Sequence, residues 1–309
     1  MASYQALYRS GELEERVERA RAILKSCELC PRCCQVNRLD GEKGVCRTAS
    51  QAVVSSCGPH FGEEAPLVGT YGSGTIFFTH CNLRCMFCQN YNISQLGEGR
   101  AASKEEVARM MLALQEQGCH NINFVSPTHV VPQILEALQV AAGLGLSIPL
   151  VYNCGGYESL ETLKLLDGIV DIFMPDMKYS DEKNGRRFSG IKNYPSVNQA
   201  AVKEMHRQVG DLQMDERGVA KRGLLVRHLV LPNDIAGTEG VVRFLAEEVS
   251  TNTYLNVMAQ YHPAHRAFKL PPLSRPLLTH EFVDAVDLAR RHGLERLDGV
   301  KSRTLARLL

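Results

Sequence analysis

Continuous apolar runs alternate with amphipathic segments along most of the chain, and this alternation predicts strands separated by helices. The apolar runs, which predict buried strands, lie at 75–78, 121–128, 148–154, 169–178, 224–232 and 254–261. The amphipathic segments, which predict helices, lie at 103–118, 131–145, 158–168, 197–209, 238–250 and 280–292. The segment 103–118 opens with Ser103 and Glu106, the spacing of a capping box.

Strands that alternate with helices in this way are typical of an α/β fold with a parallel sheet. Right-handed crossovers would curl the strand–helix units into an open (β/α)6 partial TIM barrel. A closed eight-stranded barrel needs more units than the pattern offers. A doubly wound sheet is the other alternative, but no G-x-G-x-x-G follows the first strand.

The chain before residue 69 has a different character. Residues 11–26 predict a helix, with Leu13, Val17, Ala20 and Leu24 on one face, and a cysteine-rich stretch follows. We therefore divide the chain into an N-terminal helix with a cysteine-rich leader, residues 1–68, and a partial barrel with a C-terminal helix, residues 69–309. The polar stretch 178–196 is expected to form a mobile lid or substrate loop.

Composition narrows the class of protein. The 309 residues carry a formal net charge of +1, which gives no indication of a nucleic-acid partner. The first twenty residues hold no apolar secretion signal and no run of about 18 apolar residues occurs, so we expect a cytoplasmic protein that does not enter the membrane. Eleven cysteines is an odd number, and nine lie between Cys27 and Cys88. Clustered cysteines in such a protein indicate metal ligands rather than disulfides.

Three of these cysteines follow the first strand directly. Cys81, Cys85 and Cys88 form a C-x3-C-x2-C pattern, with the aromatic Phe87 before the third. Three thiolates on one loop can hold three irons of a [4Fe-4S] cluster and leave the fourth iron open to a ligand. The alternatives are a zinc loop or reduced thiols, although zinc sites usually add a distant second pair of ligands.

The leader holds a second group of cysteines. Cys27, Cys30, Cys34 and Cys46 could close a tetrahedral zinc site, while Cys27, Cys30 and Cys33 match the start of a ferredoxin-like run. A loop of reduced thiols without metal is the third interpretation. The spacing does not choose between a second iron–sulfur cluster, zinc and no metal.

The stretch IFFTHCNLRCMFCQNYNIS at 76–94, together with RHLVLPN at 227–233, resembles the radical S-adenosylmethionine (radical SAM) superfamily, and within it proteins related to pyruvate formate-lyase activating enzyme. The resemblance implies an open barrel, a [4Fe-4S] cluster and S-adenosyl-L-methionine as cofactors. It implies an oxidoreductase that cleaves S-adenosylmethionine to a 5'-deoxyadenosyl radical, which then abstracts hydrogen.

The same resemblance implies partners. The substrate would be a glycyl residue of a glycyl radical enzyme, and the electron donor a flavodoxin or ferredoxin. Radical modification of a small molecule or peptide is an alternative, and so is a non-catalytic iron–sulfur protein for electron transfer or sensing. A carrier would need neither an open iron nor polar residues at several strand ends.

The expected cofactor-binding residues lie mostly at the carboxyl ends of the strands, where chemistry gathers in parallel α/β folds. They are Phe87, Ser126, Thr128, Asn153, Asp176, Lys178 and His262. By resemblance, Lys178 pairs with the cofactor carboxylate, Asp176 orders the site and His262 contacts the ribose. Many radical SAM proteins carry Gly-Gly-Glu at the second strand; this chain offers the hydroxyls of Ser126 and Thr128 instead.

Several of these assignments have a structural alternative. Asp176 and Lys178 could form only a salt bridge with each other, and His262 could be a core histidine. Arg227 and His228 are adjacent on one strand, so at most one of them faces the barrel interior. We assign no side chain as a catalytic group, because the cofactors carry the difficult chemistry.

Overall fold

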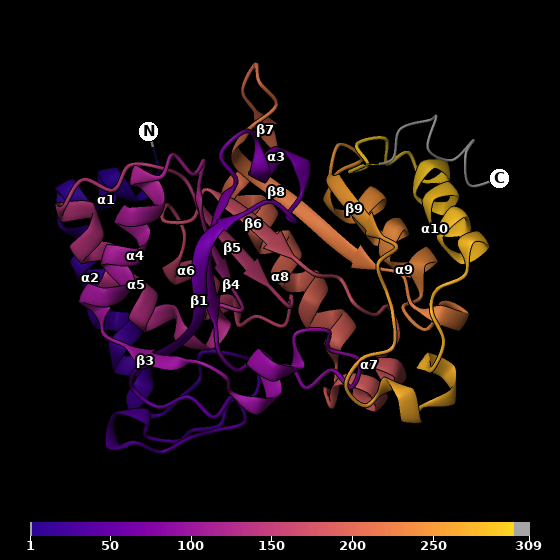
Figure 1. The fold of residues 1–309 in the computed structure, drawn as a ribbon, viewed down its shortest axis with the longest axis horizontal. Helices are drawn as coiled ribbons and strands as arrows, with labels where there is room; N and C mark the ends of the chain where they lie inside the picture. The colour runs from indigo at the N-terminus through magenta and orange to yellow at the C-terminus, as the bar shows by residue number, and fades with distance from the viewer. Residues whose placement is uncertain (1, 300–309) are drawn as a thin grey trace.

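The computed structural model describes residues 2–299 and contains the expected parallel sheet (Figure 1). Its six parallel strands are β2 (Ser73–Phe78), β4 (Ile122–Val125), β5 (Leu150–Cys154), β6 (Ile172–Pro175), β8 (Ala220–Leu229) and β9 (Tyr254–Met258). They pair in that order from β2 to β9. The free edge of β2 pairs with another strand and not with β9, so the barrel stays open. The predicted open (β/α)6 fold is confirmed.

Three antiparallel strands extend this sheet, and the sequence analysis did not predict them. β1 (Ala52–His60) pairs with β2, β3 (Arg100–Ala102) pairs with β1, and β7 (Gln213–Met214) pairs with β8. β1 comes from the predicted leader, so part of that segment belongs to the sheet. The division of the chain at residue 68 stays a prediction.

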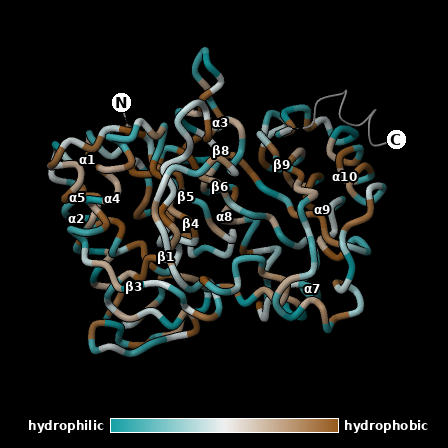
Figure 2. Tube along the Cα trace, viewed as in Figure 1, coloured by the Kyte–Doolittle hydropathy of each residue, from teal (hydrophilic) through white to brown (hydrophobic). Residues whose placement is uncertain are grey.

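Helices cover the sheet and bury its apolar side chains. In sequence order they are α1 (Tyr4–Ser10), α2 (Glu12–Ala22), α3 (Ala65–Val68), α4 (Lys104–Glu116), α5 (Val131–Gly143), α6 (Leu160–Leu165), α7 (Glu182–Ser189), α8 (Tyr194–Val209), α9 (Thr238–Phe244) and α10 (Thr279–Arg291). Figure 2 shows hydrophobic residues concentrated on the inner strands and hydrophilic ones along the outer loops. None of the helices within residues 2–299 has the length and apolar character needed to cross a membrane.

Two local predictions can be checked directly. The capping box is present: the Ser103 hydroxyl accepts from the Glu106 backbone N–H at 3.2 Å, and the Glu106 carboxylate accepts from the Ser103 N–H at 2.9 Å. The predicted lid at 178–196 is wrong, because this stretch forms α7 and the start of α8. Most of α7 is polar, but Phe188 is buried and anchors it.

Candidate functional site

The three clustered cysteines line one cavity at the carboxyl ends of the parallel strands. Cys81, Cys85 and Cys88 lie on the loop that leaves β2. Neighbouring strand ends contribute the remaining polar residues of the wall, which include Ser126, Asn153, Asp176, Lys178 and Arg227. Parallel strands end at the same edge of a sheet, which is why residues so distant in sequence meet here.

The cysteine loop is bonded to α7, which lies in the segment 178–196 that was expected to be a lid. The Met86 N–H donates to the carbonyl of Phe188 at the end of α7, at 2.8 Å. The Ser189 hydroxyl lies 3.0 Å from the Cys85 sulfur and donates to it. The polar contacts thus make α7 a support for the cysteines rather than a cover over the cavity.

Further hydrogen bonds reach the other two sulfurs. The Leu83 N–H donates to the Cys81 sulfur at 3.4 Å, and the Ser94 hydroxyl lies 3.1 Å from the Cys88 sulfur. Burial raises the pKa of the Cys81 thiol to about 12 and also raises the pKa of Cys85. A bound metal would supply the positive charge that deprotonates such thiols. Three sulfurs facing one cavity suit a cluster with one open iron.

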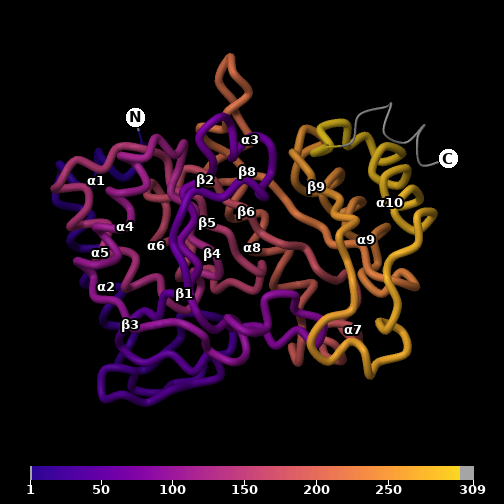
Figure 3. Tube along the Cα trace, in the orientation of Figure 1, coloured from indigo at the N-terminus to yellow at the C-terminus, as the bar shows by residue number. Residues whose placement is uncertain are grey.

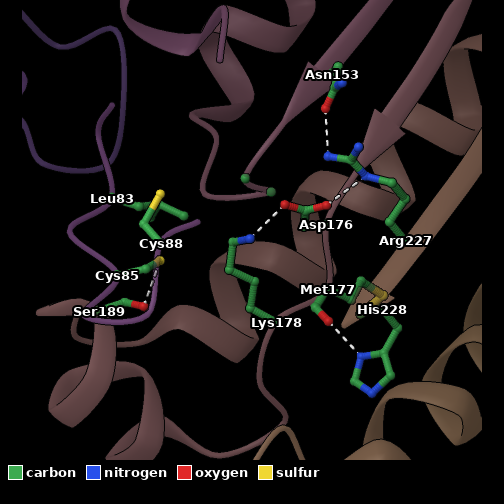
Figure 4. A network of polar contacts seen from close by, with 12 residues as sticks. Leu83, Cys85, Cys88, Asn153, Asp176, Met177, Lys178, Ser189, Arg227 and His228 are labelled. Carbon is green, nitrogen blue, oxygen red and sulfur yellow. Dashed lines mark hydrogen bonds and ion pairs between the residues drawn. The ribbon is translucent and has the colours of Figure 1, made fainter. Parts of the chain in front are cut away.

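Opposite the cysteines lies a network of charges (Figure 4). The Lys178 ammonium donates to one oxygen of Asp176 at 2.6 Å, and Arg227 Nε donates to the other at 2.8 Å. Arg227 also donates to Asn153 Oδ1 at 2.6 Å. Burial alone would raise the pKa of Asp176, but Arg227 and Lys178 outweigh it and hold that pKa below its usual value.

This network presents more positive than negative charge to the cavity. Among the residues that line the cavity, the cations Lys178 and Arg227 share the one carboxylate of Asp176. The carboxylates of Glu63, 3.9 Å from Arg227, and of Glu64 also act on Arg227 but do not line the cavity. Burial tends to lower the pKa of Lys178, yet Asp176 and the nearby Cys85 raise it overall, so the ammonium stays charged. The cavity therefore suits a ligand with a carboxylate.

The structure brings some predicted residues to this cavity and places others elsewhere. Ser126 and Asn153 line it, and Ser126 has a left-handed backbone with φ of 58°. The Thr128 hydroxyl instead donates to the buried Glu158 at 2.7 Å. Phe87 is buried against Tyr179 and Tyr261, and His262 is exposed beside Gln89. Cofactor contacts by Phe87, Thr128 and His262 stay predictions.

The adjacent side chains of Arg227 and His228 point to opposite sides of β8, as expected. Arg227 faces the cavity, while His228 is buried on the opposite side and bonds to the Met177 carbonyl and the Thr238 hydroxyl. The sequence analysis missed Tyr194, whose buried hydroxyl accepts from the Lys178 N–H at 3.0 Å and donates to the Gly155 carbonyl at 2.9 Å. Nothing in the local sequence separates this tyrosine from others in the core.

The leader cysteines meet at a second cavity, which is lined by Cys27, Cys30, Cys34 and Cys46. Cys33 is exposed and lies outside this group. The structure thus brings together the four cysteines of the tetrahedral interpretation, whereas Cys33, which the ferredoxin-like run would use, lies outside the group.

Comparisons with known proteins agree with this geometry. The model of the radical SAM superfamily matches residues 75–215. The chain is 33% identical to the uncharacterized protein MJ0674 of Methanocaldococcus jannaschii over 293 residues, covering 92% of this chain and 80% of that protein. It is 25% identical to the uncharacterized protein MJ0808 of the same organism, covering 87% and 79% of the two chains.

Among solved structures, the fold resembles that of HydG, described as a maturase of the [FeFe]-hydrogenase. The TM-score is 0.50 and the identity 14%, over 72% of this chain and 50% of that one. The chain therefore spans about half the length of HydG, and the likeness is one of fold alone.

Proposed function

Because the chain belongs to the radical SAM superfamily, we propose that Cys81, Cys85 and Cys88 hold a [4Fe-4S] cluster and that S-adenosylmethionine binds beside it. The observation that supports this most strongly is the shared cavity, in which three cysteines face a cationic network at the strand ends. When bound, these groups supply a 5'-deoxyadenosyl radical, formed with methionine from S-adenosylmethionine and one electron, that abstracts hydrogen from a substrate.

The residues of this chain bind and orient the cofactor. Lys178 and Arg227 offer charged donors to its carboxylate, and Asp176 fixes the positions of both cations. The Ser126 hydroxyl offers an acceptor for its amino group, and so does the second lone pair of Asn153 Oδ1, whose first accepts from Arg227. These neutral acceptors take the place of the glutamate that many superfamily members carry.

We propose that the substrate is a glycyl residue of a partner enzyme, as in glycyl radical activases. The support is the resemblance of residues 76–94 and 227–233 to proteins related to pyruvate formate-lyase activating enzyme. A flavodoxin or ferredoxin in a reducing cytoplasm would supply the electron. Radical modification of a small molecule or peptide is the second candidate, because the same cavity would serve it.

The test of cofactor cleavage uses anaerobically reconstituted protein with S-adenosylmethionine and dithionite. The parent chain should release 5'-deoxyadenosine, and Cys85→Ala should release almost none, because two remaining thiolates hold the cluster poorly. Cys57→Ala, at an exposed cysteine, is the matched control and should behave as the parent. Equal release from Cys85→Ala and the parent would contradict the proposal.

The substrate class needs a separate measurement. A glycyl radical enzyme carrying α-deuterated glycine should pass deuterium to 5'-deoxyadenosine and show a glycyl radical signal by electron paramagnetic resonance. Cofactor cleavage without deuterium transfer or radical signal for the tested partner would count against the activase proposal and leave the cofactor chemistry intact.

A further inference from the structure

Four leader cysteines surround a cavity of their own, apart from the one at the strand ends. Its wall contains Cys27, Cys30, Cys34 and Cys46, two arginines, and Asn82 and His129 from the barrel. The backbone of Cys27 pairs with the segment that carries Cys34, through bonds to Val36 and Gln35 at 3.0 Å each. Residues 27–46 thus form a closed loop, and all four of these cysteines line its cavity.

A buried arginine beside this cavity has no carboxylate partner in the part of the chain described. Arg38 has no exposed surface, and its guanidinium donates to the backbone carbonyls of Ala49 and His129. Its remaining polar contact is to the Cys27 sulfur, at 3.8 Å. Within residues 2–299 no carboxylate forms an ion pair with Arg38. Burying a cation without an anion is costly.

A second guanidinium also lacks a partner at this cavity within the described residues. Arg32 also lines the cavity, and its Nη2 is buried without a hydrogen-bond partner in the part of the chain described. Its other nitrogens donate to the carbonyls of Asn82 and Gly190. Two cationic groups, one fully buried and one with an unsatisfied buried donor, call for an anion between the four sulfurs. A metal centre held by four thiolates has that charge.

The leader cavity also lies next to the cysteine loop of the barrel. Cys46 and Cys81 line a common small cavity between the two sites. Asn82 contributes to the leader cavity, while its neighbours Cys81 and Leu83 line the cavity at the strand ends. Figure 3 shows the leader loop, in indigo, at the lower edge of the molecule below β3. A single short segment therefore separates the two groups of thiols.

We propose that Cys27, Cys30, Cys34 and Cys46 hold a second iron–sulfur cluster, stabilised by Arg38, that passes electrons to the cluster at Cys81, Cys85 and Cys88. Within residues 2–299 no three or more His, Cys, Asp or Glu side chains converge on the position of one metal ion. A zinc site draws four sulfurs to about 2.3 Å from one ion. Cluster ligands bind separate irons, so their sulfurs need not converge on one position.

The electron balance of the relay is simple. One electron enters from a one-electron donor protein of the flavodoxin or ferredoxin class, and the same electron leaves for the second group of thiols. No bond forms or breaks at the leader site, which returns to its oxidised state. The relay rests on the proposed function, whereas the presence of a cluster in the leader does not.

Metal analysis tests the site itself. Anaerobically reconstituted parent protein should contain about eight irons and as many sulfides per chain, for two [4Fe-4S] clusters. The double variant Cys27→Ser/Cys30→Ser should fall to about four of each. Cys33→Ser, in the same loop but outside the cavity, is the matched control and should keep the parent content. Zinc in the leader, or an iron content that the double variant leaves unchanged, would overturn the proposal.

A third variant separates this proposal from the proposed function. Replacing Cys81, Cys85 and Cys88 together by Ala should leave about four irons, bound by the leader. Loss of all iron from this variant, with its circular dichroism spectrum retained, would contradict the leader cluster even if the double variant had lost iron.

Two readouts test the roles of the centre. Formation of 5'-deoxyadenosine by the leader double variant should stay within about twofold of the parent with dithionite and fall at least about tenfold with a flavodoxin donor, a difference of about 1.4 kcal/mol or more in activation free energy. Equal loss or equal retention with both reductants would contradict the relay.

Arg38→Gln should shift the leader cluster to a more negative reduction potential, because a nearby cation favours the more negative reduced state. An unchanged potential would overturn the role of Arg38.

Discussion

Replacing Lys178 by Met separates the two interpretations of the cationic network. The change keeps a stem of similar length but removes the ammonium, which lies 2.6 Å from Asp176 and faces the cavity. If Lys178 binds the cofactor carboxylate, affinity for S-adenosylmethionine should fall. If Lys178 only neutralises Asp176, affinity should stay the same.

The magnitude follows from the burial of the group. The Lys178 side chain is 17% exposed, so solvent weakens its interactions only in part. A charge-assisted hydrogen bond contributes about 1.5–3 kcal/mol, which corresponds to a loss of affinity of roughly 10- to 150-fold. The fold should survive, because Asp176 keeps its bond of 2.8 Å to Arg227 and is not left unpaired.

The assay is anaerobic equilibrium binding of S-adenosylmethionine to protein with a measured iron content. Lys203→Met is the matched control. Lys203 is an exposed lysine of α8 that pairs with Glu248 and does not line the cavity. Parent affinity in Lys178→Met, with the Lys203→Met control also unchanged, would refute the assignment and leave Lys178 with a structural role only.

Three further predictions concern stability. Gly156→Ala should lower the free energy of unfolding by more than about 3 kcal/mol in chemical denaturation, because Gly156 has φ of 72° and a Cβ would collide with neighbouring backbone. The control Gly190→Ala, at φ of 63° with open space around it, should lower it by only about 1–2 kcal/mol. Glu158, whose pKa burial raises from 4.5 to about 7, stabilises the fold fully below pH 4.5 and loses that contribution as the pH rises through 7; Glu158→Gln should flatten this slope in denaturation measured against pH. Tyr194→Phe should cost about 1–3 kcal/mol, because the Lys178 N–H loses its acceptor, and an unchanged midpoint would contradict this.

The parallel core could be predicted from the sequence because its signal is local. Buried strands such as β5, whose five residues are all buried, appear as continuous apolar runs, and a capping box is a pattern of only four residues. β1 was missed because its later residues alternate between half-buried and exposed, and its pairing with β2 depends on a partner some twenty positions away. Such non-local pairing leaves little trace in a short window.

The error at 178–196 has a related cause. The sequence EKNGRRFS has one large apolar residue, and its composition resembles that of a loop. The helix is fixed instead by tertiary contacts, with Phe188 in the core and its carbonyl bonded to the Met86 N–H. Propensity alone could not anticipate a helix whose stability comes from the loop that it supports.

The cysteines of both sites were predictable from their spacing, but the cations that face them were not. Lysine and arginine are usually exposed, so nothing in the sequence separates Arg38 or Lys178 from the other basic residues. Burial changes this, since a cation removed from water needs an anion close by. Lys178 shares Asp176 with Arg227, whereas Arg38 has only carbonyls and the Cys27 sulfur. The same rule that explains the first network therefore indicates a missing anion at the second, and four thiols around that position identify the kind of anion to seek.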